Sequence, residues 1–311
     1  MAFSMSFSPR ALLWLSRLGL AYVVLFICLI FFTGVSVIIP QLYGNSLIHY
    51  VIGVYIFIGV SVNLFYCYRF NSFIEKKEKQ AEKDLSSVSS ASTTHSHDST
   101  TNSSGCSTKD SVDHHVDGVV PSSGHSKSHC DVCNIEMPHR SHHCILCQRC
   151  VLVREHHCFF IGSCIGQKNL KYFIIFLFHL SFGCMYALCL NYKYLTMNYV
   201  CPISWNFFEF FPPITLIEIL LDYRTWTFGY YVLGLYVTLT GFIGSTFGYV
   251  WYFLLVLMGI TSHEYYTKSS RSKFGKYYNF KMVFGRYWYI TIPCPLPVFE
   301  DAHSKFDVKL V

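Results

Sequence analysis

Residues 130–169 read CDVCNIEMPHRSHHCILCQRCVLVREHHCFFIGSCIGQKN, and seven Cys and five His fall within 35 residues of this stretch. Cys130-x-x-Cys133 and Cys144-x-x-Cys147 have the spacing at which two thiolates on a tight turn reach one ion at about 2.3 Å. The segment is too small and too polar to fold on apolar burial alone, so a metal would supply its folding free energy. Zinc is the predicted metal, and two tetrahedral ions would use eight of the twelve candidate ligands.

The surplus side chains concentrate in the His-His-Cys triplets at 142–144 and 156–158. A thiol left off the metal, two residues from a free imidazole, is a nucleophile with a nearby base, because only the thiolate attacks. Glu155 precedes the second triplet, and a carboxylate beside an imidazole can fix its tautomer. Spacing therefore indicates a base-activated cysteine made of Glu155, His156 and Cys158, and it leaves open which His is free of metal.

The composition of the whole chain indicates a membrane protein. Apolar residues make up 52% of the sequence, charged residues 14%, and the mean hydropathy is +0.34, whereas an average globular domain has about 25% charged residues. These values exclude a secreted disulfide miniprotein, a coiled coil and a wholly disordered chain. The formal charge of +6 suits a rim that faces a membrane better than a nucleic-acid groove, so no nucleic-acid partner is expected.

Four stretches are long and apolar enough to cross a bilayer, which takes about 20 residues: 18–39, 48–68, 172–192 and 231–260. Basic residues gather before the first stretch, after the second and after the fourth, while the link 40–47 has none. The positive-inside rule then puts both termini and the loop between the second and third helices in the cytosol. Cytosolic thiols stay reduced, which argues against disulfides in that loop.

The middle loop begins with a segment rich in Ser, Thr, His and Asp, which cannot offset its ordering entropy and is predicted to be disordered. The apolar stretch 207–221 holds two Pro and two Glu and is predicted to lie at the luminal interface. The expected organisation is a cytosolic N-terminus at 1–17, two helices at 18–69, a disordered linker at 70–128, a cysteine-rich domain at 129–171, a third helix at 172–192, a luminal loop at 193–230, a fourth helix at 231–260 and a cytosolic C-terminal segment at 261–311.

In order and spacing, residues 130–169 resemble the DHHC cysteine-rich domain of the protein S-acyltransferases, C-x2-C-x9-H-C-x2-C-x2-C-x4-D-H-H-C-x5-C followed by Asn. Thr261-Ser262-His263-Glu264 resembles the T-T-x-E motif of that family, and Tyr278-Asn279-Phe280 resembles part of its C-terminal aromatic segment. The resemblance implies an all-α polytopic membrane protein with four transmembrane helices. A small cytosolic zinc-binding domain of short β-hairpins would lie between helices two and three.

The resemblance also implies ligands and roles for individual residues. Cys158 would be the acyl-accepting nucleophile, His156 would be the base, and Glu155 stands where the family has Asp. The side chains expected to contact acyl-CoA are Arg140, Arg154, Lys168, Lys171 and Phe160. One structural Zn²⁺ would be held by Cys130, Cys133, His143 and Cys150, and the other by Cys144, Cys147, His157 and Cys164.

The implied function is an S-acyltransferase that moves a long-chain acyl group from palmitoyl-CoA to cytosolic cysteines of membrane-associated proteins. The expected location is the endoplasmic reticulum, the Golgi or else the plasma membrane. The chain departs from the family at Glu155 and at Phe159-Phe160, where Pro-Trp is usual. These departures also fit a catalytically weak or inactive membrane adaptor that keeps the zinc fold to bind partners. A RING-like ubiquitin ligase is disfavoured, because RING spacing has a longer gap between the middle ligand pairs.

Overall fold

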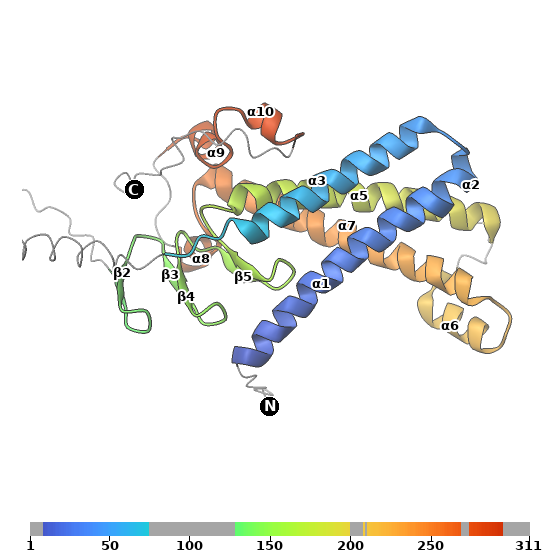
Figure 1. Ribbon diagram of the computed structural model, residues 1–311, viewed down its shortest axis with the longest axis horizontal. Helices are drawn as coiled ribbons and strands as arrows, with labels where there is room; N and C mark the ends of the chain where they lie inside the picture. Colours follow the sequence, from blue (N-terminus) through green and yellow to red (C-terminus); the bar gives the residue numbers. More distant parts are fainter. Residues whose placement is uncertain (1–8, 75–127, 200–207, 209, 269–273, 295–311) are drawn as a thin grey trace, which may run out of the picture.

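The computed structural model describes residues 9–74, 128–199, 208, 210–268 and 274–294. The long helices form a bundle, and a small β-hairpin region lies beyond one of its ends (Figure 1). This arrangement confirms the predicted fold class, a mostly helical membrane protein with a Cys- and His-rich region between the second and third spans. Four segments are long and apolar enough to cross a membrane: Ala11–Tyr43, Leu47–Arg69, Leu170–Asn198 and Trp226–Met258.

The first span consists of α1 (Pro9–Thr33), a π-helical turn η1 (Gly34–Ile38) and α2 (Ile39–Tyr43). The sequence predicts that Pro40 closes this span, but the helix continues to Tyr43. Proline disrupts a helix because it lacks an N–H and its ring clashes with the carbonyl four residues earlier. Here the backbone N–H of Ile39 donates to the Gly34 carbonyl, five residues back. Pro40 therefore lies in the first turn of α2, where the missing backbone N–H removes no hydrogen bond within the helix and costs little stability.

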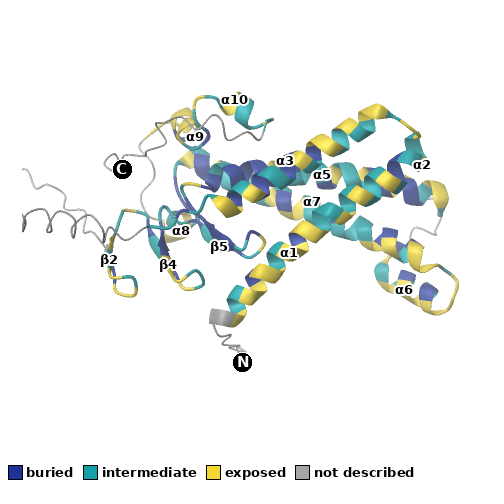
Figure 2. Cartoon of the chain, viewed as in Figure 1, coloured by how far each residue is buried: buried dark blue, intermediate teal, exposed yellow. Residues whose placement is uncertain are grey.

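The remaining spans are α3 (Leu47–Arg69), α5 (Leu170–Asn198) and α7 (Trp226–Met258). Helix α5 is the most buried of the spans, and it packs against both α3 and α7. Helix α1 crosses the bundle with an exposed apolar surface (Figure 2) that includes Trp14, Leu18, Leu25 and Phe32. Exposed apolar side chains on a helix of this length are expected to face lipid. The bundle thus has α5 at its centre and α1 at its periphery.

Three antiparallel hairpins make up the Cys- and His-rich region: β1 (Ser128–Cys130) with β2 (Ile135–Met137), β3 (His142–Cys144) with β4 (Arg149–Val151), and β5 (His156–Cys158) with β6 (Ser163–Ile165). The second and third hairpins share one register, because His143 pairs with Cys150 and His157 pairs with Cys164. In the third hairpin the turn contains Gly162 at a φ of +71°, a conformation that glycine adopts without strain. Two-stranded hairpins of this size are marginal by themselves, so something else must hold them.

The start of the predicted linker is ordered. Residues 71–74 lie along β4, where Leu152 donates to the Ser72 carbonyl and Ile74 donates to the Cys150 carbonyl. Phe73 forms a β-bridge with Val151. The chain therefore leaves α3 directly into contact with the hairpin region, whereas the prediction of disorder began at residue 70. The rest of the predicted linker, residues 75–127, lies outside the described residues.

The other boundaries also differ from the predicted ones. The third span begins at Leu170 and extends to Asn198, and the fourth begins at Trp226, so less of the segment 193–230 lies between helices than expected. Within it, Pro212–Leu220 form the short helix α6. After the fourth span come α8 (Ser262–Thr267), α9 (Lys276–Phe284) and α10 (Trp288–Thr291). Helix α8 begins with a capping box in which Thr261 and Glu264 satisfy each other's backbone N–H groups.

Candidate functional site

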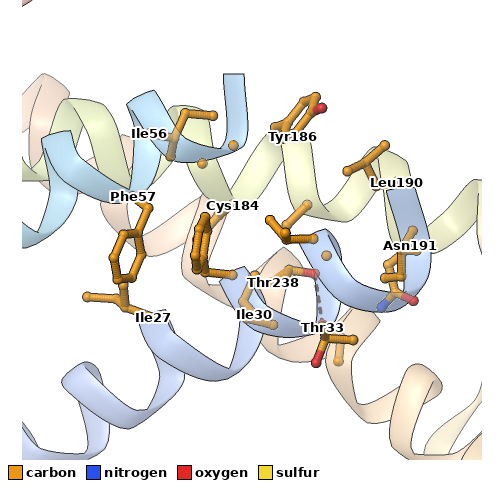
Figure 3. A pocket seen from close by; sticks show the side chains of 18 of the residues that line it. Ile27, Ile30, Thr33, Ile56, Phe57, Cys184, Tyr186, Leu190, Asn191 and Thr238 are labelled. Carbon is orange, nitrogen blue, oxygen red and sulfur yellow. Dashed lines mark hydrogen bonds between the residues drawn. The ribbon is translucent and has the colours of Figure 1, made fainter. Parts of the chain in front are cut away.

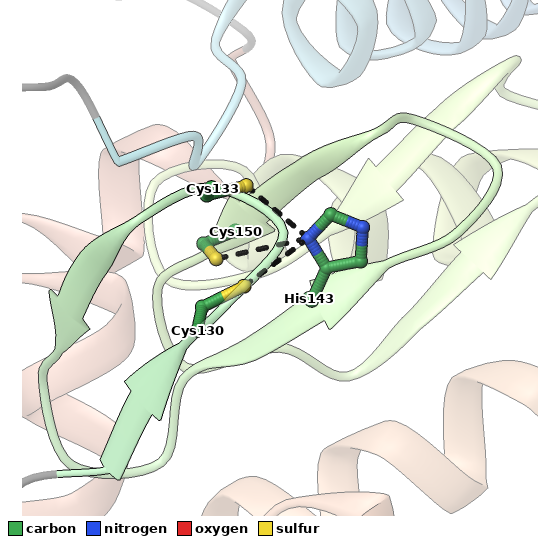
Figure 4. A group of neighbouring side chains, drawn as sticks. All are labelled: Cys130, Cys133, His143 and Cys150. Carbon is green, nitrogen blue, oxygen red and sulfur yellow. Dashed lines mark hydrogen bonds between the residues drawn. The ribbon is translucent and has the colours of Figure 1, made fainter.

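Two groups of side chains converge on points that could each hold a metal ion, and they contain the residues that the resemblance implied. In the first group, the Sγ atoms of Cys130, Cys133 and Cys150 lie 3.6, 3.3 and 3.9 Å from Nδ1 of His143 (Figure 4). Tetrahedral bonds of about 2.3 Å to sulfur and about 2.0 Å to nitrogen would put these atoms about 3.5 Å apart. The arrangement therefore fits one tetrahedral ion with three thiolates and an imidazole.

The second group repeats this geometry with Cys144, Cys147, His157 and Cys164. The three Sγ atoms lie 3.8, 3.3 and 3.6 Å from His157 Nδ1, and Cys147 Sγ lies 3.6 Å from Cys164 Sγ. The two groups interleave along the chain, because Cys144 and Cys147 of the second group fall between His143 and Cys150 of the first. Each hairpin is therefore tied to its neighbour through the ligand sets as well as through the backbone.

The outer nitrogen of one ligand is held by the first membrane helix. His157 Nε2 lies 3.1 Å from Oγ of Ser16, a buried residue of α1. Because Nδ1 faces the three thiols, Nε2 carries the proton and donates it to the Ser16 hydroxyl. Metal-binding histidines commonly donate their second N–H in this way, which fixes both the tautomer and the ring orientation.

Asn169 joins the hairpin region to the helices at the start of α5. Its side chain is fully buried and donates from Nδ2 to the carbonyls of Cys67 in α3 and Cys164 in β6, each at 3.0 Å. Its Oδ1 accepts from the Gly166 backbone N–H at 2.9 Å. One amide thus connects two helices and a strand that carries a metal ligand. The position matches the Asn that ends the DHHC pattern.

Cys158 belongs to neither ligand group. Its side chain is 8% exposed and lies in an apolar cluster with residues of α1, α3 and α5, including Val23, Val60 and Phe173. Burial raises the pKa of its thiol, while the backbone N–H groups of Ile161 and Phe160 act in the opposite direction. A buried thiol that is not part of a ligand group needs a nearby base if it is to ionise.

His156 lies two residues before Cys158 on β5, so both side chains project from the same face of the strand. Burial lowers the pKa of His156 to about 4, with smaller contributions from Arg154 and His157. The imidazole is therefore neutral at neutral pH and can accept a proton. His157, between the two, projects to the other face, where its ligand group lies.

The acid does not contact the imidazole as expected. Among the described residues, Glu155 Oε2 accepts hydrogen bonds from the backbone N–H and the hydroxyl of Ser262, both at 2.8 Å, and makes none with His156. His156 Nδ1 instead lies 2.9 Å from the hydroxyl of Tyr252 in α7. Burial raises the pKa of Glu155, and the hydrogen bonds from Ser262 oppose that shift. Glu155, which has one methylene more than the Asp of the DHHC pattern, thus places its carboxylate on the first turn of α8.

Comparison with known proteins agrees with this geometry. A family model described as DHHC palmitoyltransferase matches residues 123–269, which include both ligand groups, Cys158 and the capping box of α8. This part of the chain is similar to the DHHC palmitoyltransferase family. It is also 30% identical over 159 residues to Palmitoyltransferase ZDHHC22 of Danio rerio, a match that covers 47% of this chain and 53% of that protein. The chain therefore spans about half the length of this curated relative.

Some of the residues expected to contact acyl-CoA make contacts within the protein, and others lie toward the surface of the DHHC domain. Arg140 Nη2 is paired with Glu264 Oε2 at 2.7 Å and donates to the Gly259 carbonyl, so this side chain docks the domain onto the α7–α8 corner. Lys171 lies over the ring of Tyr172. The side chains that remain turned to the surface are Lys168 and Phe160, which are both exposed, and Arg154, which is partly buried.

An apolar cavity of about 110 Å³ lies among α1, η1, α3, α5 and α7 (Figure 3). Its lining includes Phe26, Ile30, Gly34 and Leu180, with the polar side chains of Thr238 and Asn191. The cavity shares Ile27, Ile56, Val60, Leu180 and Tyr186 with the apolar cluster around Cys158, so it adjoins the interior of the helix bundle behind the DHHC domain.

Sequence analysis did not single out Ser16 or Tyr252. Both lie far from the DHHC domain in sequence, Ser16 just before the predicted first apolar stretch and Tyr252 within the fourth, and no motif spacing marks them. A Ser in the last turns before the first apolar run gives no periodic signal, and Tyr252 is one of 23 Tyr. Their places follow only from how α1 and α7 pack against β5.

The bond from His157 to Ser16 predicts an effect on metal retention. Replacing Ser16 by Ala removes the acceptor for the outer N–H, and loss of such a partner typically lowers metal affinity about 10–100-fold. The purified Ser16→Ala protein should lose one metal equivalent to a chelator faster than wild type, measured by elemental analysis after dialysis. Ser36→Ala, on the same span but away from the DHHC domain, is the matched control. Equal metal loss from all three proteins would contradict the assigned role.

Proposed function

We propose that this chain is a protein S-acyltransferase that moves a long-chain acyl group, palmitoyl in the first instance, from acyl-CoA to cysteines of membrane-associated proteins. The observation that carries the proposal is the separation of Cys158 from two complete ligand sets. All eight predicted ligands are grouped, and the seventh thiol of the stretch is left beside an imidazole and against the apolar ends of the helices. A buried reactive thiol at this boundary can meet both a lipid chain and a water-soluble donor.

The reaction proceeds in two transfers. Cys158 gives its thiol proton to His156, and its sulfur attacks the thioester carbonyl of acyl-CoA. The bond from the carbonyl carbon to the CoA sulfur breaks, and CoA leaves as a thiol after taking up the proton. A thiol of the acceptor protein then attacks acyl-Cys158 in the same way and regenerates the free cysteine. Thioester exchange is nearly balanced in energy, so the site acts mainly through thiolate formation, positioning and exclusion of water.

We assign the two ligand groups to structural Zn²⁺ ions. Three thiolates and one imidazole are a typical ligand set of structural zinc sites, in which four protein ligands leave no position for water or substrate. Such ions supply folding free energy to small domains, and here they would hold β5 at a fixed place against the helices. In this assignment neither ion contacts Cys158, and the proton is handled by the chain's own side chains.

The acyl chain is assigned to the cavity among the helices. Helix α1 passes the active-site loop at Gly19, where an added Cβ would come within 2.6 Å of the Phe159 carbonyl oxygen. The cavity lining on α1 begins at Phe26, about 10 Å farther along the helix at about 1.5 Å per residue. A lipid chain fills about half of the roughly 30 Å hydrocarbon core, or about 15 Å. The end of a palmitoyl group on Cys158 would therefore lie near Ile30.

Acyl labelling tests the proposed activity. Purified, metal-loaded protein incubated with a labelled palmitoyl-CoA should acquire label that hydroxylamine releases, because the expected bond is a thioester. Cys158→Ser should acquire none, while Cys189→Ser, which removes an exposed cysteine of α5, should label like wild type. Absence of label on wild-type protein that retains its metal would overturn the proposal and favour the adaptor function.

The cavity assignment predicts a change in chain-length preference. Ile30→Trp should block the space for the last carbons of palmitate, which contribute about 0.8 kcal/mol per buried CH₂. Losing two of these groups favours myristoyl-CoA over palmitoyl-CoA by roughly tenfold, measured as the ratio of loading rates. Leu29→Trp, at the neighbouring exposed position of α1, should leave the ratio near its wild-type value. The assignment fails if the two variants change the ratio alike.

A further inference from the structure

The imidazole of His156 is enclosed by aromatic side chains from two membrane helices. Its ring stacks on Tyr252 with centroids 5.2 Å apart and planes 23° apart, and Phe173 of α5 meets its edge at 5.4 Å. Phe173 also contacts the Tyr252 ring edge-on. The hydroxyl of Tyr252 lies 2.9 Å from His156 Nδ1. The orientation of the imidazole is thus determined by α5 and α7, and Tyr252 supplies the polar contact.

The acid next to His156 in sequence has other partners. Ser262 donates its hydroxyl and its backbone N–H to Glu155 Oε2. The carboxylate and the imidazole, which belong to adjacent residues in sequence, therefore contact different elements, and Tyr252 supplies the hydrogen bond at Nδ1 of the imidazole.

The direction of the hydrogen bond between His156 and Tyr252 follows from the proposed reaction. A neutral imidazole has one N–H donor and one acceptor nitrogen, so a ring that takes the thiol proton at Nε2 carries its own proton on Nδ1. His156 Nδ1–H then donates to the Tyr252 oxygen. By accepting that bond, the Tyr252 hydroxyl favours the tautomer in which Nε2 can take a proton from a thiol.

We propose that Tyr252 is the positioning residue that holds His156 in its proton-accepting tautomer, in the place where a direct contact with the acid was expected. The inference rests on the proposed function, since the proton that Nε2 accepts is that of Cys158. The proton passes from Cys158 Sγ to Nε2, and no proton leaves Tyr252. When the imidazole becomes positively charged, its Nδ1–H remains bonded to the Tyr252 oxygen.

Removal of the Tyr252 hydroxyl distinguishes its role as a hydrogen-bond partner of His156 from the packing of the tyrosine ring. Tyr252→Phe keeps the ring that stacks on His156 and Phe173 and removes only the oxygen. The maximal rate at which palmitoyl-CoA loads the protein should be at least tenfold lower for Tyr252→Phe than for wild type. The KM for palmitoyl-CoA, the metal content and the melting temperature should be unchanged. Tyr249→Phe is the matched control, because Tyr249 is a partly buried tyrosine of the same helix whose hydroxyl has no hydrogen bond within the described part of the chain. It should load at the wild-type rate.

A double-mutant cycle identifies the residue through which Tyr252 acts. If the tyrosine acts through His156, then Tyr252→Phe should slow loading no further in a His156→Ala background, because coupled residues are not additive. Additive losses would overturn the inference and assign Tyr252 to packing. Loading of Tyr252→Phe at the wild-type rate would overturn it as well.

A second measurement does not depend on acyl transfer. The rate at which iodoacetamide alkylates Cys158, followed by mass spectrometry of its peptide, reports how readily the thiol loses its proton. Tyr252→Phe should lower this rate, and the effect should vanish in the His156→Ala background. If wild type fails to load acyl groups but alkylation shows this coupling, the proposed function fails while the positioning role stands. If wild type loads and neither assay shows coupling, the positioning role fails alone.

Discussion

The structure of the DHHC domain depends on the convergence of eight side chains into two ligand groups. Each of the six strands has three residues, which is too few to form a stable sheet by backbone hydrogen bonds alone. The apolar cluster within the region is small and includes ligand cysteines themselves, Cys144 and Cys164. Metal coordination is consequently the interaction that can define the backbone here. The interleaved order of the ligands means that the β3–β4 hairpin contributes to both groups and connects the other two hairpins.

The ligand groups fix the hairpins internally, but separate polar contacts set the position of the domain on the membrane helices. Ser16 holds a ligand histidine from α1, and Asn169 connects α3 to β6. On the opposite side, Arg140 and Glu155 bind the corner between α7 and α8. These contacts come from all four spans or their ends and converge around β5. The position of Cys158, on that strand, is therefore set both by the domain that carries the two ligand groups and by the helix bundle.

Sequence spacing was sufficient to indicate two metal sites in a local stretch of 35 residues, but it left open which His is free of metal. The assignment of the eight ligands came from the resemblance to the DHHC domain, and the structure brings these eight side chains into two groups. The four spans are also visible as apolar stretches, although Pro40 misled the prediction of one end because a π turn cannot be read from hydropathy. Contacts between distant segments were not accessible in this way. The partners of His156 and Glu155 are set by the packing of α7 and α8 on the domain, and the length of one side chain decides which of them the carboxylate reaches.

That difference of one methylene has a chemical consequence for the proposed reaction. A carboxylate in direct contact with His156 would stabilise the protonated ring strongly, and in a buried site it would also tend to keep the ring protonated before any thiol arrives. With the carboxylate on Ser262, the resting imidazole is neutral, in keeping with the low pKa that burial gives it. The polar contact that the imidazole makes at Nδ1 is with Tyr252 of α7. The Glu155 carboxylate instead binds the first turn of α8 and stabilises its docking against the domain, so in this chain the side chain of His156 is oriented by a membrane helix.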